Sequence, residues 1–368
     1  MKILFLIHDL GQGGAEKVLV NLVNNMDKEK FDISVIALFG GGVNEQFLEP
    51  HIHYKSVWKK EFPGNSEIMK LLSPKKLHDL CIKEKYDIEI SYLEGPSARV
   101  VSGCGSRSTK LVSWIHVEQH TMKKLSGPFR NKRETIKCYS EFDHTVCVSK
   151  FVHDDFQSIL NLSKPCSVIY NTVESEKIRR LSLEEISYPY EEKMVNMIAV
   201  GSLKETKGFD RLIRIVERLK KHNYKIHLRI LGKGPLKTYL EEMVKEKKLE
   251  EEVTFLGYDV NPYKYVEKSD LFICASRAEG FSTAATEALI VGTPVCTVDV
   301  SGMKEMLGEN NEYGIVVEND DEALYEGIKG LLDSKEKLEY YTEKAVERGK
   351  YFNTNNTVKA VENMLYSL

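Results

Sequence analysis

The feature that most constrains the fold is a unit that recurs along the chain: a short apolar run, a turn containing glycine, and an amphipathic helix. Residues Lys2 to Ile7 precede a glycine-rich turn and a helical pattern from Glu16 to Met26, and Ile226 to Leu231 precede a similar turn and helix from Leu236 to Lys247. Short apolar runs bounded by turns are typical of strands buried on both faces of a parallel sheet, whose strands need crossover helices. The sequence therefore predicts an α/β fold built from doubly wound parallel sheets.

The same pattern predicts the remaining elements. Further strands are expected at Asp32 to Leu38, Asp87 to Tyr92, Lys110 to Ile115, Phe142 to Val148, Ser167 to Tyr170, Asn196 to Val200, Val253 to Leu256, Ser269 to Ala275 and, at a sheet edge, Gly314 to Val317. Helices are expected at Phe209 to Lys220, Asp320 to Leu332, Lys335 to Tyr351 and Thr357 to Tyr366. We predict irregular loops from Gly40 to Gly64 and turn-rich chain from Glu94 to Ser108.

The length and charge of the chain indicate its organisation and exclude one class of partner. A chain of 368 residues is long enough for two domains, each with its own core. Residues 174 to 193 are charged and weakly apolar and contain Pro189, which predicts a linker with a short helix between the domains. The net charge of −3 argues against nucleic acid as the main partner.

The cysteines indicate the cellular compartment. Seven cysteines occur without a Cys-x-x-Cys pair, which predicts reduced core thiols in a cytoplasmic protein, with no disulfide framework or zinc site. The apolar run of the N-terminal segment MKILFLIHD is too short for a signal peptide, and no run approaches the roughly 18 apolar residues of a membrane span. We therefore expect any contact with a membrane to be peripheral.

Two glutamates flank the expected start of a helix in the segment from Ser276 to Glu305. Glu279 precedes this helix, which opens near Ser282 or Thr283, and Glu287 lies inside it. A helix N-terminus presents unpaired N–H groups and partial positive charge, so it suits an anion such as a diphosphate. Carboxylates beside it are suited to sugar hydroxyls. A nucleotide sugar has this arrangement, because its anionic diphosphate lies between two groups that carry hydroxyls.

This segment resembles the carboxylate-pair motif of a large enzyme family. Glu279-Gly280-Phe281, seven residues between the two glutamates, Gly292 and Pro294-Val295 are similar to the motif of retaining GT-B glycosyltransferases of family 4, also called group 1, the polysaccharide-assembly type. The alternative is a strand-to-helix turn with two surface glutamates. The resemblance implies two Rossmann-like domains facing a central cleft.

The resemblance also implies domain boundaries and roles. Residues 1–172 are expected to bind the acceptor, 173–193 to link the domains, 194–350 to bind the nucleotide sugar, and 351–368 to form a helix that crosses back to the first domain. Catalytic roles fall to His116, Glu279 and Lys207. Donor-binding roles fall to Gly13, Gly14, Ser202, Lys204, Lys207, Tyr258, Glu279, Gly280, Phe281, Ser282, Thr283 and Glu287.

One expected donor residue departs from the family pattern. Relatives carry an arginine where this chain has Ser202, and that arginine pairs with the donor diphosphate together with a lysine at the position of Lys207. Loss of one cation would weaken stabilisation of the leaving diphosphate, and Lys204 is near enough in sequence to replace it.

Structural explanations remain open for three of these sites. Gly13 and Gly14 could serve a tight turn, His116 could be a core histidine, and Lys207 could be a surface lysine at a helix start. A dehydrogenase is disfavoured, because the first glycine loop lacks a full Gly-x-Gly-x-x-Gly and the second strand ends in Phe39-Gly40 without an acid for a ribose.

A basic segment from Thr121 to Lys137 suggests a membrane surface. Its cations alternate with the apolar Met122, Leu125 and Phe129, a composition suited to anionic lipid. A solvated face is the alternative. The cations assigned to membrane or acceptor lipid are Lys123, Lys124, Arg130, Lys132 and Arg133.

The function predicted from the sequence is a retaining glycosyltransferase. By resemblance, the donor is a nucleotide sugar, with UDP favoured, and the acceptor is a saccharide, a lipid-linked intermediate of bacterial surface polysaccharide. No Asp-x-Asp occurs, so we predict no essential metal and no cofactor. The alternatives are a nucleotide-sugar epimerase or a phosphorylase on the same fold, and a non-catalytic partner subunit, which Ser202 keeps open.

Overall fold

The computed structural model describes residues 1–186, 190 and 193–368. The chain forms two compact units. The first unit comprises Met1–Val173 and Thr354–Leu368, and the second comprises Glu174–Asn353. Pro189, which the sequence places in the linker, lies outside the described residues.

The first unit is built on a seven-stranded parallel sheet in the order β3-β2-β1-β4-β5-β6-β7. The central strands β1 and β2 are buried along nearly their whole length, as the apolar runs predict. The strands are β1 (Lys2–Ile7), β2 (Asp32–Phe39), β3 (His53–Trp58), β4 (Ile88–Ser91), β5 (Lys110–Ile115), β6 (His144–Cys147) and β7 (Cys166–Val168).

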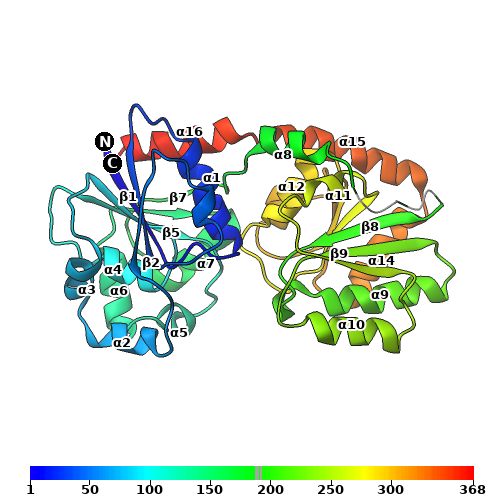
Figure 1. Cartoon of the computed structure of the whole chain (residues 1–368), viewed down its shortest axis with the longest axis horizontal. Helices are drawn as coiled ribbons and strands as arrows, with labels where there is room; N and C mark the ends of the chain where they lie inside the picture. The colour runs from blue at the N-terminus through cyan, green and yellow to red at the C-terminus, as the bar shows by residue number, and fades with distance from the viewer. Residues whose placement is uncertain (187–189, 191–192) are drawn as a thin grey trace. The chain divides into compact units, whose positions relative to one another are not determined.

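The helices of the first unit connect these strands and cover the sheet (Figure 1). They are α1 (Gly14–Asn25), α2 (Asn65–Leu71), α3 (Pro74–Cys81), α4 (Pro96–Val101), α5 (Met122–Leu125), α6 (Lys132–Ser140) and α7 (Lys150–Leu160), with α16 (Thr354–Tyr366) from the end of the chain and the short 3-10 turn Glu45–Phe47.

The last helix returns to the first unit, so both termini lie there (Figure 1). The Asp27 backbone N–H donates to Glu362 Oε1 at 2.8 Å, and the rings of Phe31 and Tyr366 lie 5.3 Å apart. Thr354 Oγ1 donates to the Val173 carbonyl at 2.8 Å. These contacts bind α16 to the body of the first unit.

The second unit holds a six-stranded parallel sheet in the order β10-β9-β8-β11-β12-β13. Its strands are β8 (Val195–Val200), β9 (Ile226–Leu231), β10 (Val253–Gly257), β11 (Leu271–Cys274), β12 (Val295–Val298) and β13 (Ile315–Val317). Its helices are α8 (Ser175–Ser182), α9 (Phe209–Lys221), α10 (Lys237–Glu246), α11 (Tyr263–Glu267), α12 (Thr283–Val291), α13 (Met303–Leu307), α14 (Asp321–Leu332) and α15 (Lys335–Tyr351), with the 3-10 turn Glu205–Lys207.

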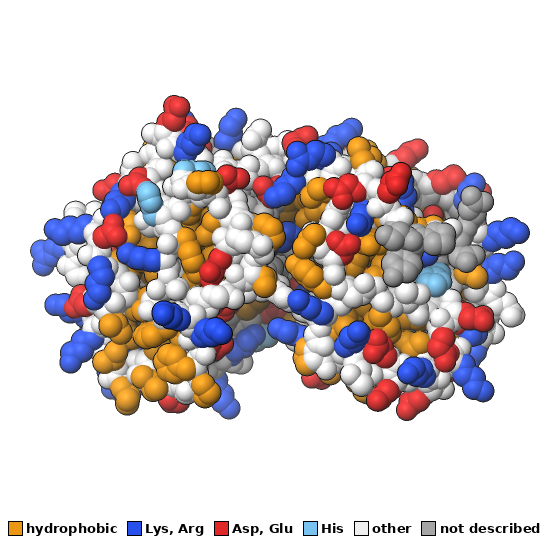
Figure 2. All heavy atoms as spheres, in the orientation of Figure 1, with side chains coloured by type: hydrophobic (Ala, Val, Ile, Leu, Met, Phe, Trp, Pro, Cys, Tyr) orange, Lys and Arg blue, Asp and Glu red, His pale blue; other side chains and the backbone are white. Residues whose placement is uncertain are grey.

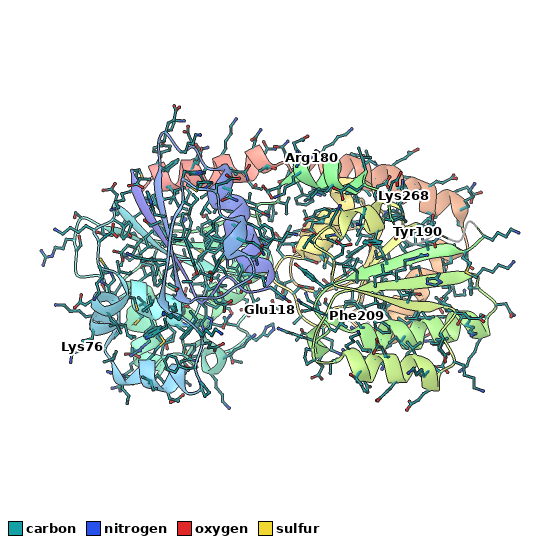
Figure 3. The ribbon with its side chains drawn as sticks, viewed as in Figure 1. Lys76, Glu118, Arg180, Tyr190, Phe209 and Lys268 are labelled. Carbon is teal, nitrogen blue, oxygen red and sulfur yellow. The ribbon has the colours of Figure 1, made fainter. Side chains whose placement is uncertain are left out.

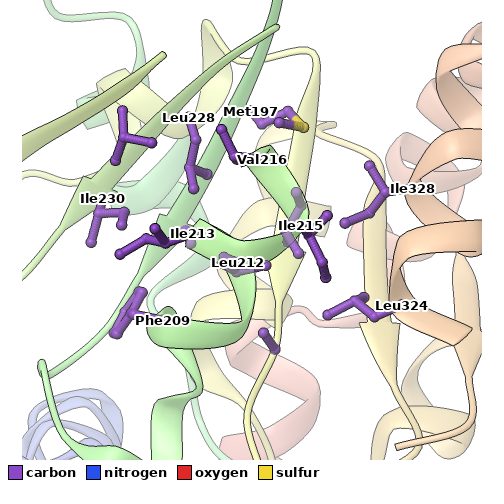
Figure 4. Close-up of a cluster of buried hydrophobic side chains, with 14 of the residues drawn as sticks. Met197, Phe209, Leu212, Ile213, Ile215, Val216, Leu228, Ile230, Leu324 and Ile328 are labelled. Carbon is purple, nitrogen blue, oxygen red and sulfur yellow. The ribbon is translucent and has the colours of Figure 1, made fainter. Parts of the chain in front are cut away.

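The core of the second unit forms where α9 packs on the sheet (Figure 4). The apolar face of α9 carries Phe209, Leu212 and Val216, which are at most 3% exposed, and they meet Leu228 of β9 and Leu324 of α14. Helix α9 therefore has one apolar stripe toward the sheet and one charged face toward solvent, as its sequence pattern predicts.

Two stretches predicted as irregular contain regular structure. Residues His53–Trp58, inside the expected loop, form β3, and Pro96–Val101, inside the expected turns, form α4. Strand β3 lies at the sheet edge and is only partly buried, so it has no apolar run to signal it. Helix α4 spans six residues and starts with a proline among turn-forming residues. Both predictions were wrong because short or edge elements leave weak patterns.

The segment after Val173 folds as part of the second unit. Helix α8 packs against α11 and α12, and Ser175, Ile178 and Ser182 are buried there. Arg179 Nη2 also donates to the Gly349 carbonyl at 3.3 Å. Despite its charge, this segment buries one face, because its few apolar and small residues share that face.

Candidate functional site

A lysine–glutamate pair lies at the carboxyl ends of β8 and β11 in the second unit. Lys207 Nζ lies 2.5 Å from Glu279 Oε1, which also accepts a 2.6 Å hydrogen bond from Ser276 Oγ. Burial works to lower the pKa of Lys207, but the Glu279 carboxylate outweighs it, so the pKa lies above its ordinary value. The ammonium is therefore charged, in a hollow that Ser282 also lines.

Gly208 determines how Lys207 approaches this pair. Lys207 ends a 3-10 turn, and Gly208 follows with φ of +65° before α9 begins. A Cβ at Gly208 would lie 2.1 Å from the Ala275 carbonyl oxygen. Only glycine lets the two strand-to-helix turns approach this closely, and that approach joins Lys207 to Glu279 across 72 residues of sequence.

Arg277 holds the loop that carries Glu279 against the start of α9. Its guanidinium makes two hydrogen bonds to the Asp210 carboxylate, at 2.8 and 2.7 Å, and a third to the Glu205 carbonyl at 2.8 Å. The Arg277 N–H donates to the Thr206 carbonyl at 2.7 Å. This bidentate pair fixes the loop geometry. The sequence analysis did not assign Arg277, although its place in the motif segment was a usable signal.

The helix that follows the loop begins where the sequence predicts. Ser282 is the N-cap of α12, and its hydroxyl accepts from the Ala285 N–H at 3.4 Å, so Thr283 is the first helical residue. Glu287, 6% exposed, faces the interior one turn later, and Phe281 packs its ring 6.0 Å from Phe352. Other N–H groups of the first turn have no helical acceptor and suit an anion.

The other predicted donor residues surround the same strand ends. Ser202 is partly buried and follows β8, and the exposed Lys204 begins the turn that holds Lys207. Tyr258 follows β10, is 50% exposed, and lies under the Lys233 ammonium, 4.5 Å from its ring centroid. All of these belong to the second unit, as does Gly280 beside Glu279. Sequence reasoning did not assign Lys233.

His116 belongs to the first unit, at the carboxyl end of β5. It is 6% exposed, its ring centre lies 4.9 Å from that of Tyr92, and burial lowers its pKa to about 3. The imidazole is therefore neutral. Among the described residues, its Nε2 is buried without a hydrogen-bond partner, so it is available to a ligand hydroxyl.

Two acids that the sequence analysis left unassigned support His116. Glu94 Oε2 accepts the His116 backbone N–H at 3.0 Å, and Asp155 accepts the N–H groups of Gln119 at 2.6 Å and His120 at 3.1 Å. Burial raises the pKa of Glu94. Glu94 lies three residues after the end of β4, at an edge where parallel strands present ligand groups, and this position was an available signal.

Glu118, labelled in Figure 3, lies in the same loop, and its Oε2 is buried without a partner in the part of the chain that the structure describes. Gly13 and Gly14 open α1 at the carboxyl end of β1, on the edge of the sheet that His116 also occupies. Gly13 is the N-cap without a side-chain cap. These two glycines therefore belong to the first unit, whereas the lysine–glutamate pair belongs to the second.

The basic segment differs from its expected form in one respect. Leu125 and Phe129 are 1% and 2% exposed, so they belong to the core and cannot enter a lipid surface. Arg130 donates to the carbonyls of Lys70 and Leu71 at the end of α2, at 2.5 and 2.7 Å. The prediction of alternating lipid-facing apolar residues was wrong, because α5 and the turn after it need an apolar face of their own to pack.

The remaining cations of the segment are exposed. Lys123, Lys132 and Arg133 face solvent, while Lys124 Nζ donates to the Glu118 carbonyl at 2.8 Å. Exposed apolar side chains come from α2 instead, where Ile68 is 51% and Leu71 is 78% exposed. Apolar side chains gather at the lower left of Figure 2, with cations beside them. Within the described chain, no helix has the length and apolar character needed to cross a bilayer.

Two family models match the chain. Residues 12–177 match Glycosyltransferase Family 4, and residues 186–348 match Glycosyl transferases group 1. The chain is 32% identical over 356 residues to a Campylobacter jejuni enzyme, N-acetylgalactosamine-N,N'-diacetylbacillosaminyl-diphospho-undecaprenol 4-alpha-N-acetylgalactosaminyltransferase, covering 94% of each. The chain is a family 4 (group 1) glycosyltransferase.

Two further comparisons support this glycosyltransferase assignment. A second Campylobacter jejuni enzyme, which adds alpha-1,4-N-acetyl-D-galactosamine to a diphospho-undecaprenol-linked saccharide, is 27% identical and covers 96% of this chain and 94% of its own. The crystal structure of Anabaena HepE in complex with UDP has a TM-score of 0.77 at 18% identity over 100% of both chains. The glycosyltransferase therefore has the GT-B fold with two Rossmann-like domains, which confirms the predicted fold class.

Proposed function

We propose that this glycosyltransferase transfers a sugar from a UDP-sugar, with retention of configuration and without an essential metal, to a saccharide linked to a lipid diphosphate. The observation that carries the proposal is the Lys207–Glu279 pair beside the N-terminus of α12. It combines a cation and helix N–H groups, which suit a diphosphate, with a carboxylate that suits sugar hydroxyls.

Each residue of this pair, and each donor residue near it, has a role in the proposal. The described contacts of Glu279 use Oε1, so Oε2 is free within the described chain to accept a donor-sugar hydroxyl. Lys207 and the backbone from Phe281 to Thr283 stabilise the diphosphate, and its charge grows as the glycosidic bond breaks. Glu287 accepts ribose hydroxyls. Tyr258 and its backbone border the base.

The proposed chemistry is front-face substitution. The acceptor hydroxyl oxygen bonds to the anomeric carbon on the face that UDP leaves, and its proton passes to the departing phosphate oxygen. The electron pair of the broken carbon–oxygen bond stays on UDP. His116, neutral with a free Nε2, binds a hydroxyl of the donor sugar. Because the usual UDP-hexose donors are alpha-linked, alpha products of the kind named for the relatives correspond to retention.

The cations present support metal independence. Lys207 and the N-terminus of α12 supply positive charge where GT enzymes with an Asp-x-Asp motif use a metal ion. We propose that no metal or cofactor takes part in transfer. The UDP complex of HepE and the undecaprenol-linked substrates of the two relatives support the choice of donor and acceptor.

The acceptor class implies a membrane contact. We place it on a surface of the first unit made of Ile68 and Leu71 on α2 with the exposed cations Lys123, Lys132 and Arg133. We call this surface the α2 patch. Apolar side chains flanked by cations suit the anionic cytoplasmic leaflet, where each cation contributes about 1 kcal/mol. The enzyme would then work in the cytoplasm, peripherally on the inner face of the membrane.

The donor proposal is tested first by thermal stabilisation. UDP, GDP, ADP and their sugars are added to wild type and to Glu287→Ala, with and without chelator. We expect UDP and UDP-sugars to raise Tm, chelator to leave that rise unchanged, and Glu287→Ala to abolish most of it. A shift with GDP or ADP alone, or one that needs a divalent ion, would contradict the proposal.

A turnover assay tests the acceptor and stereochemistry. The purified enzyme is incubated with UDP-N-acetylhexosamines and a short saccharide on an undecaprenyl diphosphate or a soluble diphosphate analogue, and the anomer of the product is read by NMR. An alpha product supports retention, and a beta product rejects it.

A second candidate function is a non-catalytic partner subunit. Ser202, in place of the family arginine, favours it, because the diphosphate loses one cation. UDP binding without turnover of any UDP-sugar, in the presence of lipid-linked acceptors, would support this alternative.

A further inference from the structure

Three side chains with metal-binding atoms meet inside the first unit, and none of them is assigned to the candidate functional site. His78 lies on α3, Glu89 on β4, and Cys104 in the turn after α4. His78 Nε2 lies 2.8 Å from Glu89 Oε2, and Cys104 Sγ lies 3.8 Å from Glu89 Oε1. All three ligand atoms lie within 4.8 Å of one another.

The burial of this cluster is unusual for charged groups. Glu89 is 2% exposed in the sheet core, where a buried carboxylate is costly without a partner, and it is paired with His78. His78 is buried as well, whereas Lys76, labelled in Figure 3, points outward from the same helix. Cys104 is partly exposed, so the cluster has one side open to solvent.

The donor set matches one class of ion. An imidazole nitrogen, a carboxylate oxygen and a thiolate sulfur are the three ligand types of protein zinc sites, and hard ions such as Mg²⁺ and Ca²⁺ avoid sulfur. We propose that His78, Glu89 and Cys104 bind a zinc ion, with a water from the open side as the fourth ligand.

The geometry needs only small changes to accept the ion. Tetrahedral ligands at about 2.0–2.3 Å from zinc stand roughly 3.3–3.8 Å apart. Cys104 Sγ lies 3.8 Å from Glu89 Oε1, which matches this range, whereas His78 Nε2 lies 2.8 Å from the other oxygen, Oε2. The carboxylate and the imidazole must therefore shift for one oxygen to serve as the ligand.

Without metal, protons hold the cluster together. Burial works to lower the pKa of His78, but hydrogen bonds to Cys104 and Glu89 outweigh it and raise the pKa to about 9. Zinc binds neutral imidazole and thiolate, so it competes with protons for such ligands, and its affinity for the cluster should fall as the pH falls.

The site would tie elements of the first unit together. It joins α3 and the turn after α4 to β4, and these are packed neighbours in the first unit. Lys207, Glu279 and Glu287 belong to the second unit. None of the three ligands has a role in the proposed transfer, His116 of the same unit included, so zinc should stabilise the first unit without taking part in transfer. Sequence spacing could not reveal the site, because its ligands come from three elements.

Direct titration tests the proposal. The full-length protein is stripped with chelator, dialysed and titrated with Zn²⁺ against a chromophoric chelator, then with Cd²⁺ while the thiolate charge-transfer band is followed. We expect one tight Zn²⁺ and a Cd²⁺–thiolate band.

Two alanine variants localise the ion. Cys104→Ala should abolish the Cd²⁺ band and weaken Zn²⁺ binding about 100-fold or more, whereas Cys81→Ala, which removes a buried thiol from α3 outside the cluster, should change neither. Equal binding by wild type and Cys104→Ala, or no tight Zn²⁺ in wild type, would overturn the site. The UDP-dependent rise in Tm is compared within one metal condition, so the two proposals fail separately.

Discussion

The ligand edges of the two sheets differ in how their polar groups are paired. In the second unit, Lys207 is paired with Glu279, and Arg277 with Asp210. In the first unit, His116 Nε2 and Glu118 Oε2 are buried without partners in the described chain. Paired charges hold their geometry before an anion arrives, whereas unpaired buried atoms await uncharged hydroxyls. The difference agrees with our proposal that the edge of the second unit binds the diphosphate and the edge of the first unit binds sugar hydroxyls.

The largest expected effect comes from Lys207→Met. This change removes the cation at the ligand edge of the second unit's sheet and leaves Glu279 without its ion-pair partner. We expect kcat/KM to fall about 100- to 1,000-fold, the usual cost of losing one charge-stabilising donor, with weaker UDP binding. Steady-state kinetics and UDP calorimetry check this. Lys221→Met, which changes an exposed lysine at the end of α9, serves as the control, and an equal loss there would show that the pairing of Lys207 has no special role.

A smaller effect is expected from His116→Ala, at the ligand edge of the first unit's sheet. Activity should fall about 10- to 50-fold through loss of a hydrogen bond and of packing, while the dissociation constant of UDP stays unchanged. A change in UDP affinity equal to the loss of activity would contradict the assignment to the sugar.

The low pKa of His116 predicts that the stability of the protein depends on pH. Burial lowers the His116 pKa from 6.5 to about 3, so between these values the unfolded chain binds the proton and the native chain does not. Its contribution to stability is complete above pH 6.5 and is lost as pH falls toward 3. Denaturant unfolding of wild type and His116→Asn from pH 7 to pH 4 should show a shallower decline in the variant.

Ser202→Arg tests the comparison between the two sheets, because it adds a cation to the ligand edge of the second unit. A charge-assisted hydrogen bond to the diphosphate should tighten UDP binding about tenfold. Calorimetry measures this directly. Unchanged affinity would indicate that Lys204 or Lys233 already neutralises the diphosphate.

The smallest expected effect concerns the α2 patch. Leu71→Ser should weaken partition onto vesicles with anionic lipid about fivefold, because one large apolar side chain is lost from the contact. Vesicle sedimentation checks this, with Leu183→Ser, an equally exposed leucine of the second unit, as the control. Equal losses in both variants would place the contact elsewhere.

The sequence predicted most of the fold because the strands carry apolar runs and the helices carry one apolar face. Strand Lys110–Ile115 and helix Lys335–Tyr351 form within the predicted bounds. Edge strand His53–Trp58 was missed because its half-exposed residues form no such run. The carboxylate motif and the start of α12 at Thr283 could also be predicted, because a helix cap and the spacing of two glutamates depend only on residues near each other in the sequence.

The pairings between elements were decided only by the tertiary structure. A periodic pattern states which face of an element is buried, but it does not name what that face meets. Hence Glu94 and Arg277 were missed as supports, and Phe129 was taken for a lipid contact although it is core. Sequence by itself determined the sheets, the helix starts and the types of side chain available. Packing decided which cation met which carboxylate, because close approaches such as that of Gly208 to Ala275 bring distant residues together.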